Sequence, residues 1–188
     1  MKKLMLSVFA LAAVVLSANA ATPSSGSQTG YGKAELLSPI AVSTLATAGA
    51  AAGTLEYGRL IIPATEQSIT LTPTIGASLA TAFTSTDAGT MATSGGSVKS
   101  TAGFRIAGVK GQTVYIHLPA SANLTNATDG DAADLVISDF VTSLSLNTGN
   151  LSGTTGQLDF FVGGKLTVPA SAYAGLYAGS YTVTVDYE

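Results

Sequence analysis

Apolar and polar side chains alternate strictly along the last eight residues of the chain. The apolar set shares one face of an extended backbone and consists of Tyr181, Val183, Val185 and Tyr187. The polar set shares the opposite face and consists of Thr182, Thr184, Asp186 and Glu188. This period of two predicts a half-buried β-strand. The sequence ends with this strand, and we expect its edge and the terminal carboxylate to be available to another chain.

Short apolar stretches bounded by Gly, Pro, Asn or Asp recur along the rest of the chain, and none has helical periodicity over the length of a stable helix. The alanine- and glycine-rich residues 46–53 are expected to form a loop, and Gly163 and Gly164 a turn or bulge. We expect strands at residues 40–42, 55–62, 68–71, 112–118, 134–146, 157–162 and 165–168, and two strand pieces around Gly103. Many short strands predict an all-β, antiparallel, immunoglobulin-like sandwich.

The first twenty residues follow a different pattern. Lys2 and Lys3 precede an apolar run over residues 4–16, and small residues follow at Ala18 and Ala20. This order is typical of a secretory signal peptide, cleaved after Ala20. The run is shorter than the ~20 residues that span a bilayer, and no later stretch qualifies, so we expect no membrane span in the mature chain. The predicted organisation is a signal peptide at 1–20, an N-terminal arm at 21–38 and a domain at 39–188.

Charge and cysteine content narrow the classes of function. The full chain has a formal net charge of −3, and losing Lys2 and Lys3 makes the mature chain more acidic. Its few basic residues are scattered, which argues against nucleic-acid binding. There is no Cys, so an exported fold must be held by packing, hydrogen bonds or a partner. Only 10% of residues are charged, which suits a surface that packs against copies of itself.

Catalytic and metal-binding chemistry have few candidates. His117 is the single histidine, which excludes hydrolytic triads and histidine-based metal sites, and we expect it on the outer face of its strand. The one carboxylate cluster consists of Asp129, Asp131, Asp134 and Asp139. Ala133 stands where a calcium loop needs a ligand, so a solvated loop is expected. We therefore expect no enzyme activity, no metal and no cofactor.

Two positions near the end of the chain carry a resemblance to a known class. Tyr187 is the penultimate residue and Gly175 is fourteenth from the end, a coincidence expected in about 0.4% of chains of this composition. With the alternation between them, this end resembles subunits of Gram-negative chaperone-usher pili. The stretches at residues 163–170 and 174–181 are similar to an uncharacterised secreted bacterial β-sandwich family, a distant relative of these pilins and of spore coat protein U.

The resemblance implies a sandwich that lacks its last strand and is completed by a donor strand from another chain. The groove would be lined by Gly175, Tyr181, Val183, Val185 and Tyr187. It implies assembly into a surface fibre (fimbria) from copies of the protein, with a periplasmic chaperone and an outer-membrane usher as partners. Tyr187 and the carboxylate of Glu188 would contact the chaperone. The absence of Cys departs from the commonest pilin pattern.

The N-terminal arm would supply the donor strand. Residues 21–32 are rich in Ser, Thr and Gly, so the apolar donor is expected at residues 29–37. One register uses Tyr31 and Leu37, with Lys33 and Glu35 on the same face. The other uses Ala34 and Leu36, and both remain open.

A second interpretation is a self-complete secreted or coat-like β-sandwich that binds carbohydrate or another surface. In that case the terminal strand belongs to a finished sheet, and the monomer needs no chaperone.

Overall fold

The computed structural model describes residues 27–46, 51–74, 86–88, 91–94, 98–130 and 132–188. The chain divides into two compact units, Met1–Leu36 and Leu37–Glu188. This division lies close to the expected boundary between arm and domain at residue 38. The expected signal peptide at 1–20 lies outside the described residues.

The second unit is built from β-strands. The only helical element in the described part of the chain is the short 3-10 turn η1, Ser145–Asn147. No helix found there has the length and apolar character needed to cross a membrane. The strands are β1 (Ala41–Leu45), β2 (Gln67–Thr72), β3 (Thr86–Ala88), β4 (Ala102–Ala107), β5 (Thr113–His117), β6 (Ser121–Asn126), β7 (Leu135–Thr142), β8 (Thr148–Asn150), β9 (Gln157–Val168), β10 (Tyr177–Ala178) and β11 (Thr184–Tyr187).

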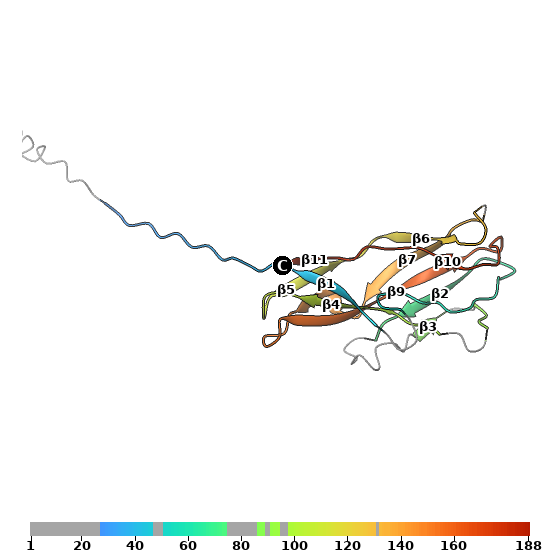
Figure 1. Ribbon diagram of the computed structural model, residues 1–188, viewed down its shortest axis with the longest axis horizontal. Helices are drawn as coiled ribbons and strands as arrows, with labels where there is room; N and C mark the ends of the chain where they lie inside the picture. The colour runs from blue at the N-terminus through green and yellow to red at the C-terminus, as the bar shows by residue number, and fades with distance from the viewer. Residues whose placement is uncertain (1–26, 47–50, 75–85, 89–90, 95–97, 131) are drawn as a thin grey trace, which may run out of the picture. The chain divides into compact units, whose positions relative to one another are not determined.

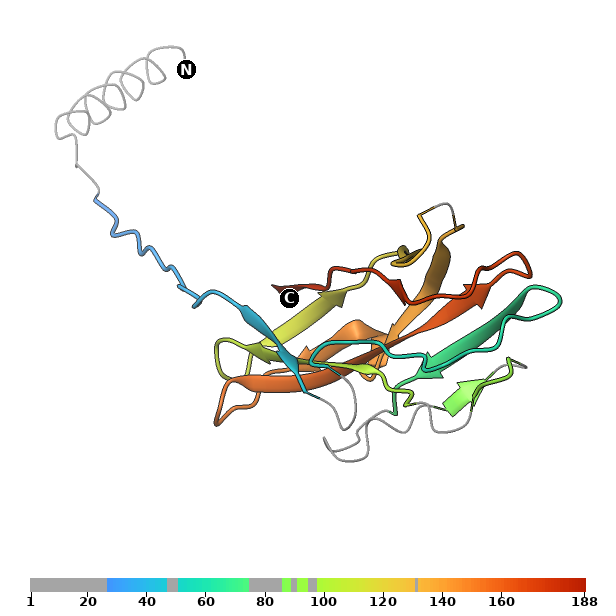
Figure 2. The same cartoon turned by 45° about the vertical axis from the view of Figure 1, so that its right-hand side comes forward.

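The strands form two antiparallel sheets. The larger has the order β1-β4-β9-β7-β6-β10, with β2 paired to both β9 and β3, and the smaller has the order β11-β5-β8. Every strand pair is antiparallel. Figure 1 shows β9 crossing the middle of the larger sheet, and Figure 2 shows β5 extending over it. The predicted all-β antiparallel sandwich is confirmed.

Two apolar clusters form the core. The first joins β2, β7 and the second half of β9, and it consists of Tyr57, Ile69, Leu71, Met91, Leu135, Ile137, Leu166 and Val168. The second lies between the inner faces of the two sheets and consists of Ala102, Phe104, Ile106, Val114, Ile116, Leu151, Phe160 and Val162. Leu55 and Phe140 pack against both clusters, so they connect the two halves of the core.

Strand β9 corrects one prediction. Residues 157–162 and 165–168 were expected as separate strands, but β9 runs without a break through Gly163 and Gly164. A Cβ at Gly163 would collide with the carbonyl oxygen of Leu71, and one at Gly164 would lie 3.0 Å from Cγ2 of Ile137. The pair is therefore explained by close packing of neighbouring strands, not by a turn.

Other strand boundaries also differ from expectation. Residues 55–62 form no strand and contribute only isolated bridges, from Glu56 to Ser100 and from Leu60 to Thr93. Strand β4 passes through Gly103 as one piece. A Cβ at this position would lie 3.2 Å from Leu45 Cβ, so close packing of β1 accounts for the glycine. Strands β3, β6, β8 and β10 are not predicted by the sequence pattern.

Candidate functional site: the edge formed by the first and last strands

The last strand pairs with the smaller sheet through one neighbour. β11 runs antiparallel to β5, with Val185 opposite Ile116 and Tyr187 opposite Val114. The regular strand begins at Thr184, three residues later than the alternation at Tyr181 predicts. Within the described residues, β5 is the only strand that pairs with β11. Its second edge is therefore unpaired there.

The alternating side chains of the last strand turn toward the core. Tyr181, Val183, Val185 and Tyr187, here called the terminal row, all pack against the second cluster. Each remains half-buried, whereas the residues between them are exposed. The structure thus brings together four of the five predicted groove residues on one face. The terminal row covers the core and is itself only partly covered.

Tyr181 makes the aromatic contacts of the terminal row with Phe104 and Phe140. Its ring centroid lies 5.1 Å from that of Phe140 and 6.4 Å, edge-on, from that of Phe104. Its hydroxyl is buried and has no hydrogen-bond partner among the described residues. Burial raises the pKa of this phenol above its ordinary value, because the ionised form would lose its hydration.

Tyr57 repeats this arrangement in the first cluster. It is 5% exposed, and its hydroxyl also lacks a hydrogen-bond partner in the described part of the chain. Burial raises its pKa well above the ordinary range, and the negative charge that Tyr181 would carry raises it further. Both hydroxyls stay protonated at neutral pH.

Tyr187 connects three segments of the domain through its hydroxyl. The oxygen accepts a hydrogen bond from the Val109 N–H at 2.8 Å and donates one to the Ser38 carbonyl at 2.9 Å. A Cβ at Gly108 would lie 2.5 Å from this oxygen, so glycine permits the contact. The penultimate tyrosine, predicted to contact a partner, therefore ties the chain end to the β4–β5 turn and to the residues before β1.

The terminal residue continues the same pairing. The Glu188 N–H donates to the Thr113 carbonyl at 3.1 Å, while its side chain is exposed. The carboxylate is therefore accessible, and the backbone leading to it is held against β5.

The first strand forms the other side of this edge. β1 pairs with β4, its only partner in the described residues, and Val42 lies opposite Ile106. Opposed residues of a ladder point to the same side of the sheet. Ile106 is fully buried, yet Val42 is 41% exposed. The core-facing side of β1 is thus open, and we call β1, β11 and the terminal row the open edge.

Gly175 lies apart from the open edge. It belongs to the connection between β9 and β10, where a Cβ would lie 2.5 Å from both side-chain polar atoms of Asn126. The Asn126 Oδ1 accepts hydrogen bonds from the N–H groups of Thr128 and Asp129, which fixes that amide. Close approach of this amide accounts for glycine here, and Gly175 does not line the row formed by Tyr181 and its neighbours.

The expected donor residues are exposed. Tyr31 and Leu36 are 90% and 94% exposed, and Ala34 is exposed as well. None of the described residues of the first unit lies in a strand. Leu37 begins the second unit and is 42% exposed.

The remaining candidate residues are His117 and the aspartates. His117 lies on the outer face of β5, where its Nε2 is 2.9 Å from Asp186 Oδ2. The described residues contain no group of three or more His, Cys, Asp or Glu side chains that could hold a metal ion. Asp131, part of the expected carboxylate cluster, lies outside the described residues.

The fold and the open edge define an all-β antiparallel sandwich domain whose outermost strands each pair on one side in the described residues. The sequence model of the family described as "Domain of unknown function (DUF4402)" matches residues 40–187, and the chain belongs to this family. No curated protein and no solved structure matches the chain.

Proposed function

We propose that this protein is a structural subunit of a bacterial surface fibre whose copies are joined by strand exchange. The observation that carries the proposal is the open edge, where the terminal row is half-buried and Val42 on β1 is 41% exposed. An extended segment with alternate apolar side chains would add backbone hydrogen bonds to β11 and cover these side chains. The mechanism is assembly, without catalysis.

The binding strength of such a junction comes from two sources. The inserted strand gains main-chain hydrogen bonds along the edge of β11 that is unpaired among the described residues, and its side chains remove apolar area from water at about 25 cal/mol per Å². Dissociation requires all these contacts to open together, so the junction is expected to separate very slowly.

The N-terminal arm of a second copy is the proposed donor. Tyr31 and Leu36 are almost fully exposed, so large apolar groups are available for burial. One register inserts Tyr31 and Leu37, and the other inserts Ala34 and Leu36. A charge placed at Leu36 or at Leu37 distinguishes the two, because only the inserted position is buried at the junction.

The open edge also suggests which partners the subunit needs during assembly. An unpaired strand beside apolar side chains tends to aggregate in water, so an exported subunit needs temporary cover. We propose a periplasmic chaperone for this role and an outer-membrane usher for polymerisation. The Tyr187 hydroxyl is already bonded within the chain, so the exposed Glu188 carboxylate is the better candidate for a chaperone contact.

The test compares unboiled and boiled SDS samples of sheared cell-surface material, probed for this chain. We expect a ladder of polymers that collapses to monomer on boiling. Deleting residues 21–37 is expected to abolish the ladder while chaperone binding persists. Val183→Asp, in the terminal row, is expected to abolish both. Thr182→Asp is the matched control, since this neighbour is exposed on the outer face and its variant should assemble normally.

A single monomer band in both lanes for the unaltered protein would contradict strand exchange and favour the self-complete sandwich. A normal ladder from the chain lacking residues 21–37 would show that the donor is another segment.

A further inference from the structure

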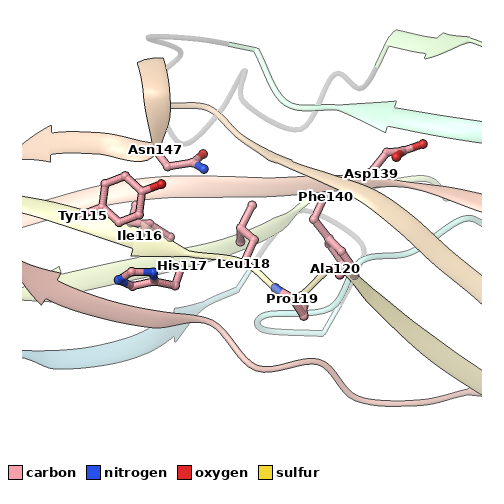
Figure 3. Close-up of a pocket in the computed structure, with 9 residues that line it drawn as sticks. All are labelled: Tyr115, Ile116, His117, Leu118, Pro119, Ala120, Asp139, Phe140 and Asn147. Atoms are coloured by element: carbon pink, nitrogen blue, oxygen red, sulfur yellow. The ribbon is translucent and has the colours of Figure 1, made fainter.

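A cavity of about 360 Å³ lies at the end of β5, on the side away from β11. Strand β8 pairs with β5 only as far as Tyr115, so the following residues of β5 have no neighbour on that side among the described strands. The cavity, here called the bulge pocket, is lined by the end of β5, the Pro119–Ala120 corner, β7 and η1 (Figure 3). This size suits a small molecule.

A β-bulge shapes one wall of the pocket. The pairing of β7 with β9 shifts register between Ser138 and Val141. Before the shift Leu135 and Ile137 point inward, and after it Phe140 turns toward the core and Asp139 outward. Bulges of this kind re-aim side chains near binding sites. Asp139 and Phe140 both line the pocket as a result.

The backbone around the pocket holds unusual conformations. Among the described non-glycine residues, only Asp139, Leu146 and Asn147 have positive φ, at 50°, 53° and 58°. Asp139 and Asn147 line the pocket, and Leu146 precedes Asn147. Asp and Asn adopt this left-handed region more readily than other non-glycine residues. For Leu146 it costs about 1 kcal/mol or more, and such conformations persist where surrounding structure imposes them.

The pocket combines an apolar floor with a polar rim. Figure 3 shows Leu118 at the centre, with Tyr115 and Asn147 together on one side and Phe140 and Asp139 on the other. The Asn147 Oδ1 accepts a hydrogen bond from Thr142 Oγ1 at 2.9 Å, which orients the amide. Its Nδ2 hydrogens have no partner in the described residues and are available to a ligand.

The described lining carries little charge. Asp139 is its single carboxylate, and one carboxylate is too few to hold a metal ion by itself. The described lining contains no Lys or Arg to bind an anion, because Lys165 lies outside it at 3.8 Å from Asp139, and its His117 is already 2.9 Å from Asp186 Oδ2. The lining therefore fits a neutral ligand with hydroxyl groups and one apolar face. A pyranose sugar has both, because its ring presents C–H groups on a face and hydroxyls around its rim.

We propose that the bulge pocket binds a neutral hexopyranose, with the ring against Leu118 and Phe140 and its hydroxyls bonded to Asn147, Tyr115 and Asp139. This site lies on the opposite edge of β5 from the open edge, so the proposal does not depend on strand exchange. The terminal row and the bulge pocket share no lining residue, although Tyr181 of the row packs against Phe140 of the pocket.

Saturation-transfer NMR on the mature protein tests the proposal, because it works for monomers and polymers alike. The probes are D-glucose, D-galactose, D-mannose and N-acetyl-D-glucosamine, each titrated to millimolar concentration. We expect at least one to receive saturation, with a millimolar Kd. Asn147→Gly keeps the positive φ and removes the amide, and Tyr115→Phe removes the hydroxyl. Each is expected to weaken binding about tenfold.

Tyr173→Phe is the matched control, since Tyr173 is an exposed tyrosine outside the pocket, and it should bind like the parent. Unchanged circular dichroism verifies that each variant is folded. The proposal is wrong if none of the four sugars receives saturation, or if folded Asn147→Gly and Tyr115→Phe proteins bind as tightly as the parent.

Discussion

Strands β5 and β11 lie side by side and carry the same alternation, yet their inner faces differ in burial. Val114 and Ile116 of β5 are fully buried, whereas Val185 and Tyr187 opposite them are half-buried. β5 lies between β11 and β8, and Val114 and Ile116 belong to the second cluster, whereas β11 has one neighbour among the described strands and its side chains only pack against that cluster. Alternation therefore tells which face of a strand turns inward, and the position of the strand inside the sheet or at its edge decides how completely that face is covered.

The largest expected effect comes from truncating the covered strand. Ile116→Ala removes fully buried methyl groups and leaves a cavity, so we expect the free energy of unfolding to fall by about 3 kcal/mol. Val185→Ala, its partner in the ladder, removes half-buried groups and should cost about 1 kcal/mol. Urea unfolding followed by circular dichroism measures both. Equal losses would mean that the two strands are equally covered, which contradicts an open edge at β11.

The next effect appears at alkaline pH and compares the two buried tyrosines. Burial raises the pKa of Tyr57 and of Tyr181, so the folded chain keeps both protons where the unfolded chain loses them. Stability is thus fully present below pH ~10 and falls above it, by up to about 1.4 kcal/mol per pH unit for each tyrosine.

Tyr57→Phe and Tyr181→Phe each remove the pH-dependent contribution of one tyrosine to stability. Each also removes a buried hydroxyl that has no partner in the described residues. At pH 7 each variant should be as stable as the parent or slightly more stable. Urea unfolding between pH 8 and 11 should show a shallower loss for each variant, and by a similar amount, because the folded chain keeps both phenol protons over this range. An unaltered slope in the double variant would contradict the burial of both hydroxyls.

Local sequence signals account for much of the fold. The alternation at Thr113–His117 and near the chain end, together with the turn residues between apolar stretches, predicted β5, β11 and the all-β class. Strand β6 was missed because Asn123 and Asn126 are typical of loops, although Ala122 and Asn126 are buried. Gly163 and Gly164 are expected at a turn or bulge: the turn is wrong, whereas Gly164 does lie opposite the β-bulge of β7. Glycine has the same local signature whether it bends a chain or admits a neighbouring strand.

The candidate sites depend on contacts that local patterns do not encode. The terminal row could be predicted from its period of two, but the exposure of Val42 depends on which strand flanks β1. The bulge pocket forms because β7 gains one residue relative to β9, a consequence of pairing between distant segments. The hydrogen bond from Tyr187 to Ser38 likewise joins opposite ends of the domain.

The smallest expected effect concerns the hydrogen bond from Tyr187 to Ser38. It sharpens the comparison of β5 with β11 at the end of β11. Tyr187→Phe keeps the ring in the terminal row but leaves the Val109 N–H and the Ser38 carbonyl without this partner. We expect a loss of about 1 kcal/mol in urea unfolding. Tyr177→Phe is the matched control, because among the described residues its hydroxyl bonds only to the backbone of Tyr173, four residues away, and its loss should cost about 0.5 kcal/mol or less.

The two substitutions also differ in what they do to the open edge. Tyr187 holds the residues before β1 against the end of β11, so its loss should loosen both flanks of the edge and speed amide hydrogen exchange at Val109 and Val42. Tyr177→Phe should leave exchange at both positions unchanged. If Tyr187→Phe costs no more than Tyr177→Phe and exchange at Val42 does not change, the flanks are held by the core alone. The half-burial of β11 would then reflect only its missing neighbour.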